Sequence, residues 1–233
     1  PLRGAVCRAA VAALEAQRDA PEFELIVADD GSTDATPARL ARHSSARPFR
    51  VLTLPPRGPA AARNEAVRAA TGERVAFLGD DTLPAAGWLA EHERGLRARG
   101  SGDELAVLGY TNWDPRMRLT RFLRYLNEEG LQFGYSLIDR PEDVPFNFFY
   151  TSNLSLARRR LLDEPFDEGF PYAAWEDIEA SYRLARRGLR LVYQPSATVA
   201  HYHPTDFDRF CLRQERAGYC AVVFWQRHPE LGQ

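Results

Sequence analysis

The sequence predicts an α/β fold in which a mostly parallel sheet is flanked by helices. Short apolar segments alternate with amphipathic ones through the first half of the chain, which is the pattern of βαβ units. The 233 residues are 45% hydrophobic, so one such domain can bury a full core. Adjacent Asp residues follow two of the apolar segments, and open α/β sheets bind ligands at the carboxyl ends of their strands. We therefore expect a binding site at that edge of the sheet.

Each predicted strand is a short run of apolar or β-branched residues bounded by turn residues. The runs cover residues 23–28, 50–54, 75–78, 105–110, 151–156, 189–193 and 197–202. Pro84 is expected to stop further pairing after the third run, because proline has no backbone N–H to donate. The aromatic run 146–150 fits either a strand or a pocket wall, and core packing is its expected role.

The predicted helices carry apolar residues at helical spacing. They cover residues 2–18, 60–70, 86–99, 117–126, 175–187 and 207–225, with further helix starts near 34–37 and after residue 156. The aromatic residues of the last helix are expected to cover a core rather than to bind a membrane. No Pro/Gly/Ser-rich linker divides the chain, which favours one domain.

The composition excludes several classes of function. A formal net charge of −2 argues against bulk attraction to nucleic acid. All 30 basic residues are arginine, which excludes a P-loop lysine and a Schiff-base mechanism. Cys7, Cys211 and Cys220 lack CxxC spacing, so reduced thiols in a cytoplasmic setting are expected. No long apolar run and no signal peptide occur, so no transmembrane segment is expected, while peripheral contact with a membrane stays open.

Two acidic strand ends form the first candidate site. Asp29 and Asp30 follow the first predicted strand, and Asp80 and Asp81 follow the third, after Gly79. Adjacent carboxylates repel each other, and a hard cation such as Mg²⁺ would neutralise them while it binds phosphate oxygens. A solvated acidic turn is the alternative, since turns favour Asp.

A further group of acids opens the helix predicted at 175–187. Glu176, Asp177 and Glu179 stand at its start, and arginines stand at its end. This order of charges suits the helix dipole, which by itself accounts for the acids. The dipole would also favour the charged form of Asp177 and so lower its basicity.

Taken in order, these motifs resemble those of the family 2 glycosyltransferases of the GT-A fold. The matching stretches are IVADDGS (26–32), ARN (62–64), FLGDD (77–81), TSNLS (151–155), WEDIE (175–179) and VAHYH (199–203). The resemblance extends from residue 4 to about residue 204. It implies a GT-A-like doubly wound sheet and an inverting, hexosyltransferase-type activity, such as bacteria use in polysaccharide biosynthesis. The donor would be a nucleoside-diphosphate sugar, UDP- or GDP-linked, and the acceptor a hydroxyl of a carbohydrate or another molecule.

On the donor side, the resemblance implies that Asp29 or Asp30 accepts hydrogen bonds from the uracil or ribose. Arg63 would lie near the base and the diphosphate, where a guanidinium forks onto oxygen atoms. Asn153 falls within a matching motif and is expected to bind substrate.

The resemblance also implies a divalent cation, Mn²⁺ or Mg²⁺, that stabilises the diphosphate as the sugar leaves. Asp81 and Asp80 match the metal motif, although Gly79 stands where the family often has an Asp. His201 resembles a further ligand, and imidazole suits Mn²⁺ better than Mg²⁺. His203 points the same way on an extended strand, so the two histidines stay open as alternatives.

Asp177 resembles the catalytic base, which takes the proton from the acceptor hydroxyl. The adjacent Glu176 is the competing candidate, because only one of the two can face the substrate. Trp175 beside them would form an apolar wall for a sugar, with packing at the helix cap as the alternative.

The family begins with a strand whose end holds the nucleotide, and the helix at 2–18 normally follows it. That strand is missing here, so we expect the 233 residues to be a trimmed part of a longer chain. We expect a single catalytic domain over 1–233, in which 1–110 binds the nucleotide sugar, 111–204 holds the acceptor and catalytic residues, and 205–233 forms a C-terminal helix.

Two other functions remain as alternatives. A nucleotidyltransferase of similar topology also binds a nucleotide by acidic strand ends, but it normally needs Lys or Arg in a Gly-rich loop after its first strand. A non-catalytic nucleotide- or sugar-binding module is the second alternative, which the missing strand keeps open.

Overall fold

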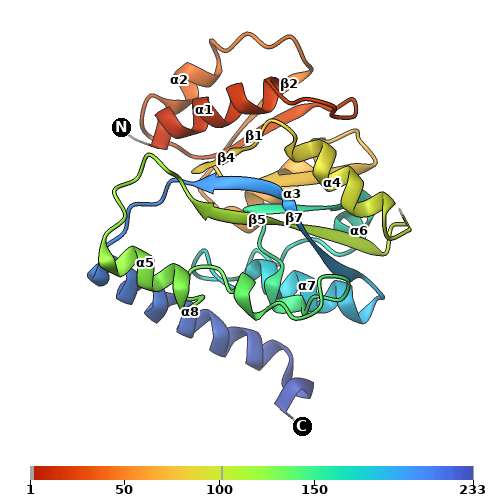
Figure 1. Ribbon diagram of the computed structural model, residues 1–233, viewed down its shortest axis with the longest axis vertical. Helices are drawn as coiled ribbons and strands as arrows, with labels where there is room; N and C mark the ends of the chain where they lie inside the picture. The colour runs from red at the N-terminus through yellow and green to blue at the C-terminus, as the bar shows by residue number, and fades with distance from the viewer. Residues whose placement is uncertain (1–2, 101, 233) are drawn as a thin grey trace.

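The computed structural model describes residues 3–100 and 102–232 and confirms an α/β fold (Figure 1). Its strands form two sheets. In the smaller sheet, β1 (Leu25–Asp30) and β2 (Phe49–Leu54) run parallel. The larger sheet has the strand order β3-β6-β5-β7-β4. Its strands are β3 (Arg74–Leu78), β4 (Thr82–Pro84), β5 (Leu105–Trp113), β6 (Asn153–Ala157) and β7 (Arg190–His201).

The larger sheet is mixed, which refines the mostly parallel sheet expected from the sequence. β5 and β7 pair in parallel, whereas β6 pairs antiparallel with both β3 and β5. β4 pairs antiparallel with β7, because the turn at 79–81 reverses the chain after β3. β3, β5 and β7 therefore share one direction, and their carboxyl ends meet at one edge of the sheet.

Among the described residues, no strand pairing joins the two sheets. β1 and β3 each have one neighbour, so each leaves one edge without a strand partner among the described residues. Glu24, next to β1, instead accepts hydrogen bonds from the backbone N–H groups of Thr71 (2.6 Å) and Gly72 (3.2 Å), shortly before β3. No further strand lies between β1 and β3 among residues 3–100 and 102–232.

Helices pack on both sheets (Figure 1). α1 (Arg3–Glu15) packs on β4, and α4 (Trp88–Arg97) packs on β5 and β7. α3 (Pro59–Ala69) packs on β1 and β2, and α6 (Arg158–Asp163) packs on β3 and β6. The remaining α-helices are α2 (Thr36–Leu40), α5 (Arg121–Glu128), α7 (Glu176–Arg186) and α8 (Phe207–Arg227). Below the sheet in Figure 1, α5 and α8 lie side by side, and the ring of Phe122 contacts those of Phe207 and Phe210.

Several single elements differ in detail from the expectation. The short strand β4 was not expected; it ends at Pro84, which lies opposite Val199 on this edge strand, where a missing N–H donor is tolerated. The run 146–150 begins with a 3₁₀-helix, Phe146–Phe148, and not with a strand, while Phe148 and Phe149 are buried in the core, as expected for this run. The two strands expected at 189–193 and 197–202 are one strand, β7, which is irregular opposite Gly109 and Tyr110.

The core is built on both faces of β5. Residues 105–108 of this strand are each 0% exposed. Leu105 and Val107 pack with Leu96 of α4, while Leu108 packs on the opposite face with residues of α3, α6 and α7. Full burial of one such side chain contributes roughly 1.5–3 kcal/mol. Because β5 is buried on both faces, it holds in place the sheet edge at which the candidate residues lie.

Candidate active site

The turn after β3 lies beside the ends of two other strands. The Gly79 N–H donates to the Ser152 carbonyl (3.3 Å), just before β6. The Tyr202 N–H donates to the Asp81 carbonyl (2.7 Å), and Thr82 of β4 is paired with His201 of β7. These backbone hydrogen bonds place the Asp80–Asp81 turn next to the histidines at the end of β7.

Asp81, His201 and His203 form a group that can hold a metal ion. Asp81 Oδ2 lies 3.2 Å from His201 Nε2 and 3.2 Å from His203 Nδ1. One ligand atom from each residue lies within 4.8 Å of the other two. The His201 ring is stacked between His203 (centroids 5.1 Å apart) and Trp113 (5.7 Å), which fixes its orientation. One carboxylate and two imidazoles suit a transition-metal ion such as Mn²⁺, so the side chains fit the expected cation.

The charge of Asp81 is maintained by its two partners. Burial would raise the pKa of Asp81, but the hydrogen bonds and charges of His201 and His203 outweigh it and hold that pKa well below its usual range. Asp81 is therefore ionised at neutral pH and able to bind a cation.

Asp80 does not belong to the group of ligand atoms that lie within 4.8 Å of one another, so its role as a second ligand stays a prediction. Its side chain is exposed. Burial, followed by the charges of Asp80 and Asp29, raises the pKa of the Cys7 thiol on α1. Asp80 and Asp29 thus lie on the same side of the molecule, near Cys7.

Asp29 and Asp30 differ in what they bind. Asp30 Oδ1 accepts from the Arg57 N–H (2.8 Å) and Oδ2 from the Gly58 N–H (2.8 Å), so both oxygens hold the loop before α3. Asp29 is 5% exposed; its Oδ1 accepts from the Ser32 N–H (3.1 Å), while Oδ2 is buried without a hydrogen-bond partner. Asp29 therefore has an acceptor to offer a ligand, and Asp30 has a structural role.

Arg63 is paired with the acid beside the expected base. Its Nη1 donates to Glu176 Oε1 (2.7 Å), and its guanidinium lies 5.6 Å from the centre of the Phe166 ring. Glu176 is 4% exposed, and its Oε2 has no hydrogen-bond partner. The pair connects α3 with the start of α7, across more than a hundred residues of sequence.

Asp177 has a more basic carboxylate than its position on the helix suggests. Burial and the charge of Glu176 raise the pKa of Asp177 to about 7, against the smaller lowering effects of Arg63 and of backbone N–H groups. The lowering expected from the helix dipole alone is thus outweighed. Hydrogen bonding connects Asp177 to the backbone of Thr151, next to the residue that binds Gly79, so Asp177 lies at the same sheet edge as the metal-binding group.

Trp175 precedes the two acids in a left-handed conformation. Its φ of 70° is unusual for a large side chain, and such backbone strain tends to occur at functional sites. The Trp175 ring packs on Phe224 of α8, with centroids 5.2 Å apart. The C-terminal helix therefore supports the segment that carries Asp177.

Asn153 was expected to bind substrate, and the structure contradicts this. It is 0% exposed. Its Oδ1 accepts from Trp88 Nε1 (2.7 Å) and His92 Nε2 (2.9 Å), and its Nδ2 donates to the carbonyls of Tyr110 (3.0 Å) and Ala197 (2.9 Å). All hydrogen-bonding positions of the Asn153 side chain are thus filled. Its Nδ2 satisfies the carbonyls of Tyr110 and Ala197 where the pairing of β5 with β7 is irregular. No feature of the sequence distinguishes it from a surface Asn at a strand start.

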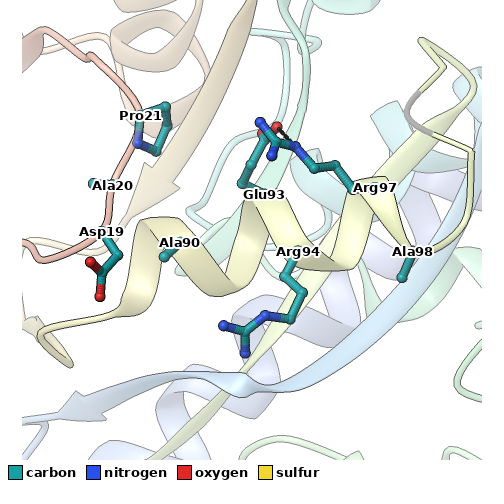
Figure 2. Close-up of a pocket in the computed structure, with 8 residues that line it drawn as sticks. All are labelled: Asp19, Ala20, Pro21, Ala90, Glu93, Arg94, Arg97 and Ala98. Atoms are coloured by element: carbon teal, nitrogen blue, oxygen red, sulfur yellow. Dashed lines mark hydrogen bonds and ion pairs between the residues drawn. The ribbon is translucent and has the colours of Figure 1, made fainter.

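A groove of about 620 Å³ lies apart from these residues, between residues 19–21 and α4 (Figure 2). None of the candidate site residues lines it. The arginines in its wall are already engaged, since Arg97 pairs with Glu93 (2.7 Å) and Arg94 pairs with Glu91. The groove therefore offers no unpaired cation for a phosphate group.

The fold and the side chains at its edge define a class: an α/β domain with acidic strand ends, a group of side chains that can hold a metal ion and a carboxylate able to accept a proton. The chain belongs to glycosyl transferase family 2, whose model matches residues 3–166. The pre-mycofactocin glycosyltransferase of Mycobacterium tuberculosis is 29% identical over 228 residues, covering 89% of this chain and 43% of the relative. The hyaluronan synthase of Pasteurella multocida is 28% identical over 216 residues, covering 80% of this chain and 22% of the relative. The chain thus spans about half the length of its curated relatives, or less.

Solved structures agree on the GT-A fold. The mannosyltransferase PcManGT from Pyrobaculum calidifontis, in complex with GDP-Man and Mn²⁺, has a TM-score of 0.67 at 21% identity, covering 97% of this chain and 61% of that one. TarS of S. aureus, in complex with UDP-GlcNAc, has a TM-score of 0.63 at 19% identity, covering 86% of this chain and 55% of that one. Within the described part of the chain, no helix combines the length and apolar character needed to cross a membrane.

Proposed function

We propose that this domain transfers a sugar from a nucleoside-diphosphate sugar to an acceptor hydroxyl, with inversion at the anomeric carbon and with a divalent cation. The strongest support is that Asp81, His201 and His203 meet at the sheet edge where Asp177 also lies. A nucleotidyltransferase would give the Glu176–Asp177 helix no role.

Asp81, His201 and His203 would hold the cation, which would supply positive charge to the leaving diphosphate. We favour Mn²⁺ over Mg²⁺, because Mg²⁺ prefers oxygen ligands whereas two of the three side chains offer imidazole nitrogen. Asp80, exposed in the same turn, would contact the sugar or ribose of the donor.

Asp29 would bind the nucleotide through its buried, unpartnered Oδ2. Arg63 would act through Glu176, to which it is bound, and would approach the diphosphate if that ion pair opens. The donors named for the solved neighbours, UDP-GlcNAc and GDP-Man, support a UDP- or GDP-linked sugar.

Asp177 would accept the proton of the acceptor hydroxyl while its oxygen attacks the anomeric carbon and the diphosphate leaves. A pKa near 7 makes the carboxylate a stronger base than an ordinary Asp. The proposal keeps the division in which residues 1–110 bind the donor, 111–204 supply the acceptor and catalytic side, and 205–233 form the C-terminal helix.

The proposal is tested with a panel of nucleotide sugars, by measuring released nucleoside diphosphate with Mn²⁺, with Mg²⁺ or with a chelator. Asp81→Asn should abolish the metal-dependent part of UDP or GDP binding in calorimetry. Asp208→Asn, at an exposed position on α8, serves as the matched control and should bind like the wild type. Equal nucleotide binding by Asp81→Asn and wild type, unaffected by chelator, would contradict the metal assignment.

A further inference from the structure

Two aromatic rings span the distance between the metal-binding group and the expected base. The Phe133 ring lies against His201 (centroids 5.6 Å apart) on one side and against Tyr150 (5.4 Å) on the other. Tyr150 in turn is close enough to Asp177 for that carboxylate to help raise its pKa, after the larger effect of burial. The ring contacts therefore lead from His201 through Phe133 to Tyr150, which lies in the neighbourhood of Asp177.

Phe133 and Tyr150 are not fully enclosed by the core. Both are partly exposed, whereas Phe148 and Phe149 beside them are 5% and 0% exposed. The Tyr150 hydroxyl accepts only a long hydrogen bond from the Gly134 N–H (3.5 Å), which leaves its own hydrogen able to donate. By contrast, the hydroxyl of the neighbouring Tyr135 is bound to Thr111 Oγ1 (3.1 Å).

The position of these rings decides what they can bind. In the proposed reaction, the donor diphosphate lies at the Asp81 group and the attacking hydroxyl lies at Asp177. A molecule carrying that hydroxyl would therefore lie beside Phe133 and Tyr150, which stand between these two positions. A pyranose ring presents a flat C–H face that packs on aromatic rings and a rim of hydroxyls that a tyrosine can hydrogen-bond. A flexible peptide or a simple alcohol lacks such a face.

We propose that Phe133 and Tyr150 form the acceptor subsite and that the acceptor is a carbohydrate, bound by the apolar face of a sugar ring. This inference rests on the proposed function, because it uses the positions of the metal-binding group and of Asp177. Phe133 supplies the stacking surface, and Tyr150 adds a hydrogen bond near the attacking hydroxyl.

The test compares Phe133→Leu and Tyr150→Phe with Phe148→Leu, in which a buried neighbouring ring is changed in the same way. Acceptors are methyl glycosides of glucose, galactose, mannose and N-acetylglucosamine, together with a serine peptide and glycerol. We expect the wild type to prefer a glycoside. Phe133→Leu should raise the KM for that glycoside about tenfold, which corresponds to ~1.4 kcal/mol, and should change the donor KM much less. Phe148→Leu should lower the melting temperature without changing the acceptor KM.

Two results would overturn the subsite: an unchanged acceptor KM in Phe133→Leu, or equal use of glycerol and the glycosides by the wild type. If the wild type cleaves no donor at all, the proposed function fails, and glycoside binding is then followed by saturation-transfer NMR. Loss of the glycoside signal in Phe133→Leu but not in Phe148→Leu would still support the subsite, and its persistence in both would refute it.

Discussion

Replacing Glu176 by Gln should shift the pH dependence of sugar transfer toward lower pH. Asp177 must be deprotonated to act as a base, and its pKa is raised to about 7 by burial and by the charge of Glu176. Wild-type transfer should therefore be lost as the pH falls through about 7. The E176Q variant keeps the size of the side chain, removes one negative charge and releases Arg63 from its ion pair. Both changes lower the pKa of Asp177, so activity should extend to lower pH.

The size of this shift follows from the Coulomb energy between the neighbouring carboxylates. At an effective dielectric constant of ~20, neighbouring unit charges interact by roughly 1–3 kcal/mol. Because one pKa unit corresponds to ~1.36 kcal/mol, the acidic limb of the profile should move down by about one to two units. Asp177→Asn should instead lower transfer by roughly 10²–10⁴-fold at every pH, since it removes the proposed base itself.

The assay follows initial rates of nucleoside diphosphate release, with acceptor present, across the neutral pH range. Glu65→Gln on the surface of α3 is the matched control, because its side chain is 36% exposed and pairs only with Arg68 among the interactions described for it. An acidic limb that stays in place in Glu176→Gln would refute the electrostatic reasoning. An inactive Glu176→Gln beside an active Asp177→Asn would make Glu176 the base.

Three further predictions follow from individual side chains. Burial lowers the pKa of His92 from 6.5 to about 4. The free energy of unfolding of the wild type should therefore fall by about 3 kcal/mol as the pH falls from about 6.5 to about 4, because the folded state resists protonation of this ring. In urea unfolding, His92→Gln should not show this pH-dependent decrease. At the left-handed position 175, Trp175→Gly should be more stable than Trp175→Ala by about 1 kcal/mol, whereas equal urea midpoints would show that the backbone there is not strained. Asp29→Asn should weaken UDP or GDP binding in calorimetry while leaving the melting temperature nearly unchanged, and Asp30→Asn should lower the melting temperature, because only Asp30 has both oxygens bound to the chain.

The sequence predicted the ends of the strands better than the directions of the strands. Acidic pairs after apolar runs located Asp29 and Asp81, because strand ends and turn residues are local signals; Asp29 and Asp30 were expected to follow the first strand but are the last two residues of β1. The reversal into β4 was missed, since three residues ending in proline carry no readable strand pattern. The antiparallel pairing in this sheet could therefore be recognised only in the tertiary structure.

Individual roles in the site depended on contacts between distant segments. The resemblance pointed to His201, and the two-residue period of a strand allowed His203, but only their common distance to Asp81 shows that both can contribute to one candidate metal site. The burial of Asn153 depends on Trp88 and His92, which lie more than sixty residues away and form no local pattern. Pairings of this kind cannot be read from spacing along the chain.

The two sheets differ in burial, and this difference has a consequence for local unfolding. Most residues of β1 and β2 are only half-buried or exposed, whereas residues 105–108 of β5 are each 0% exposed. The amides of β1 and β2 should therefore exchange with deuterium sooner than those of β5. Asp29 lies on β1, whereas Asp81 lies in the turn between β3 and β4. A nucleotide sugar bound by both residues would stabilise β1 against opening, so donor binding should slow exchange throughout β1.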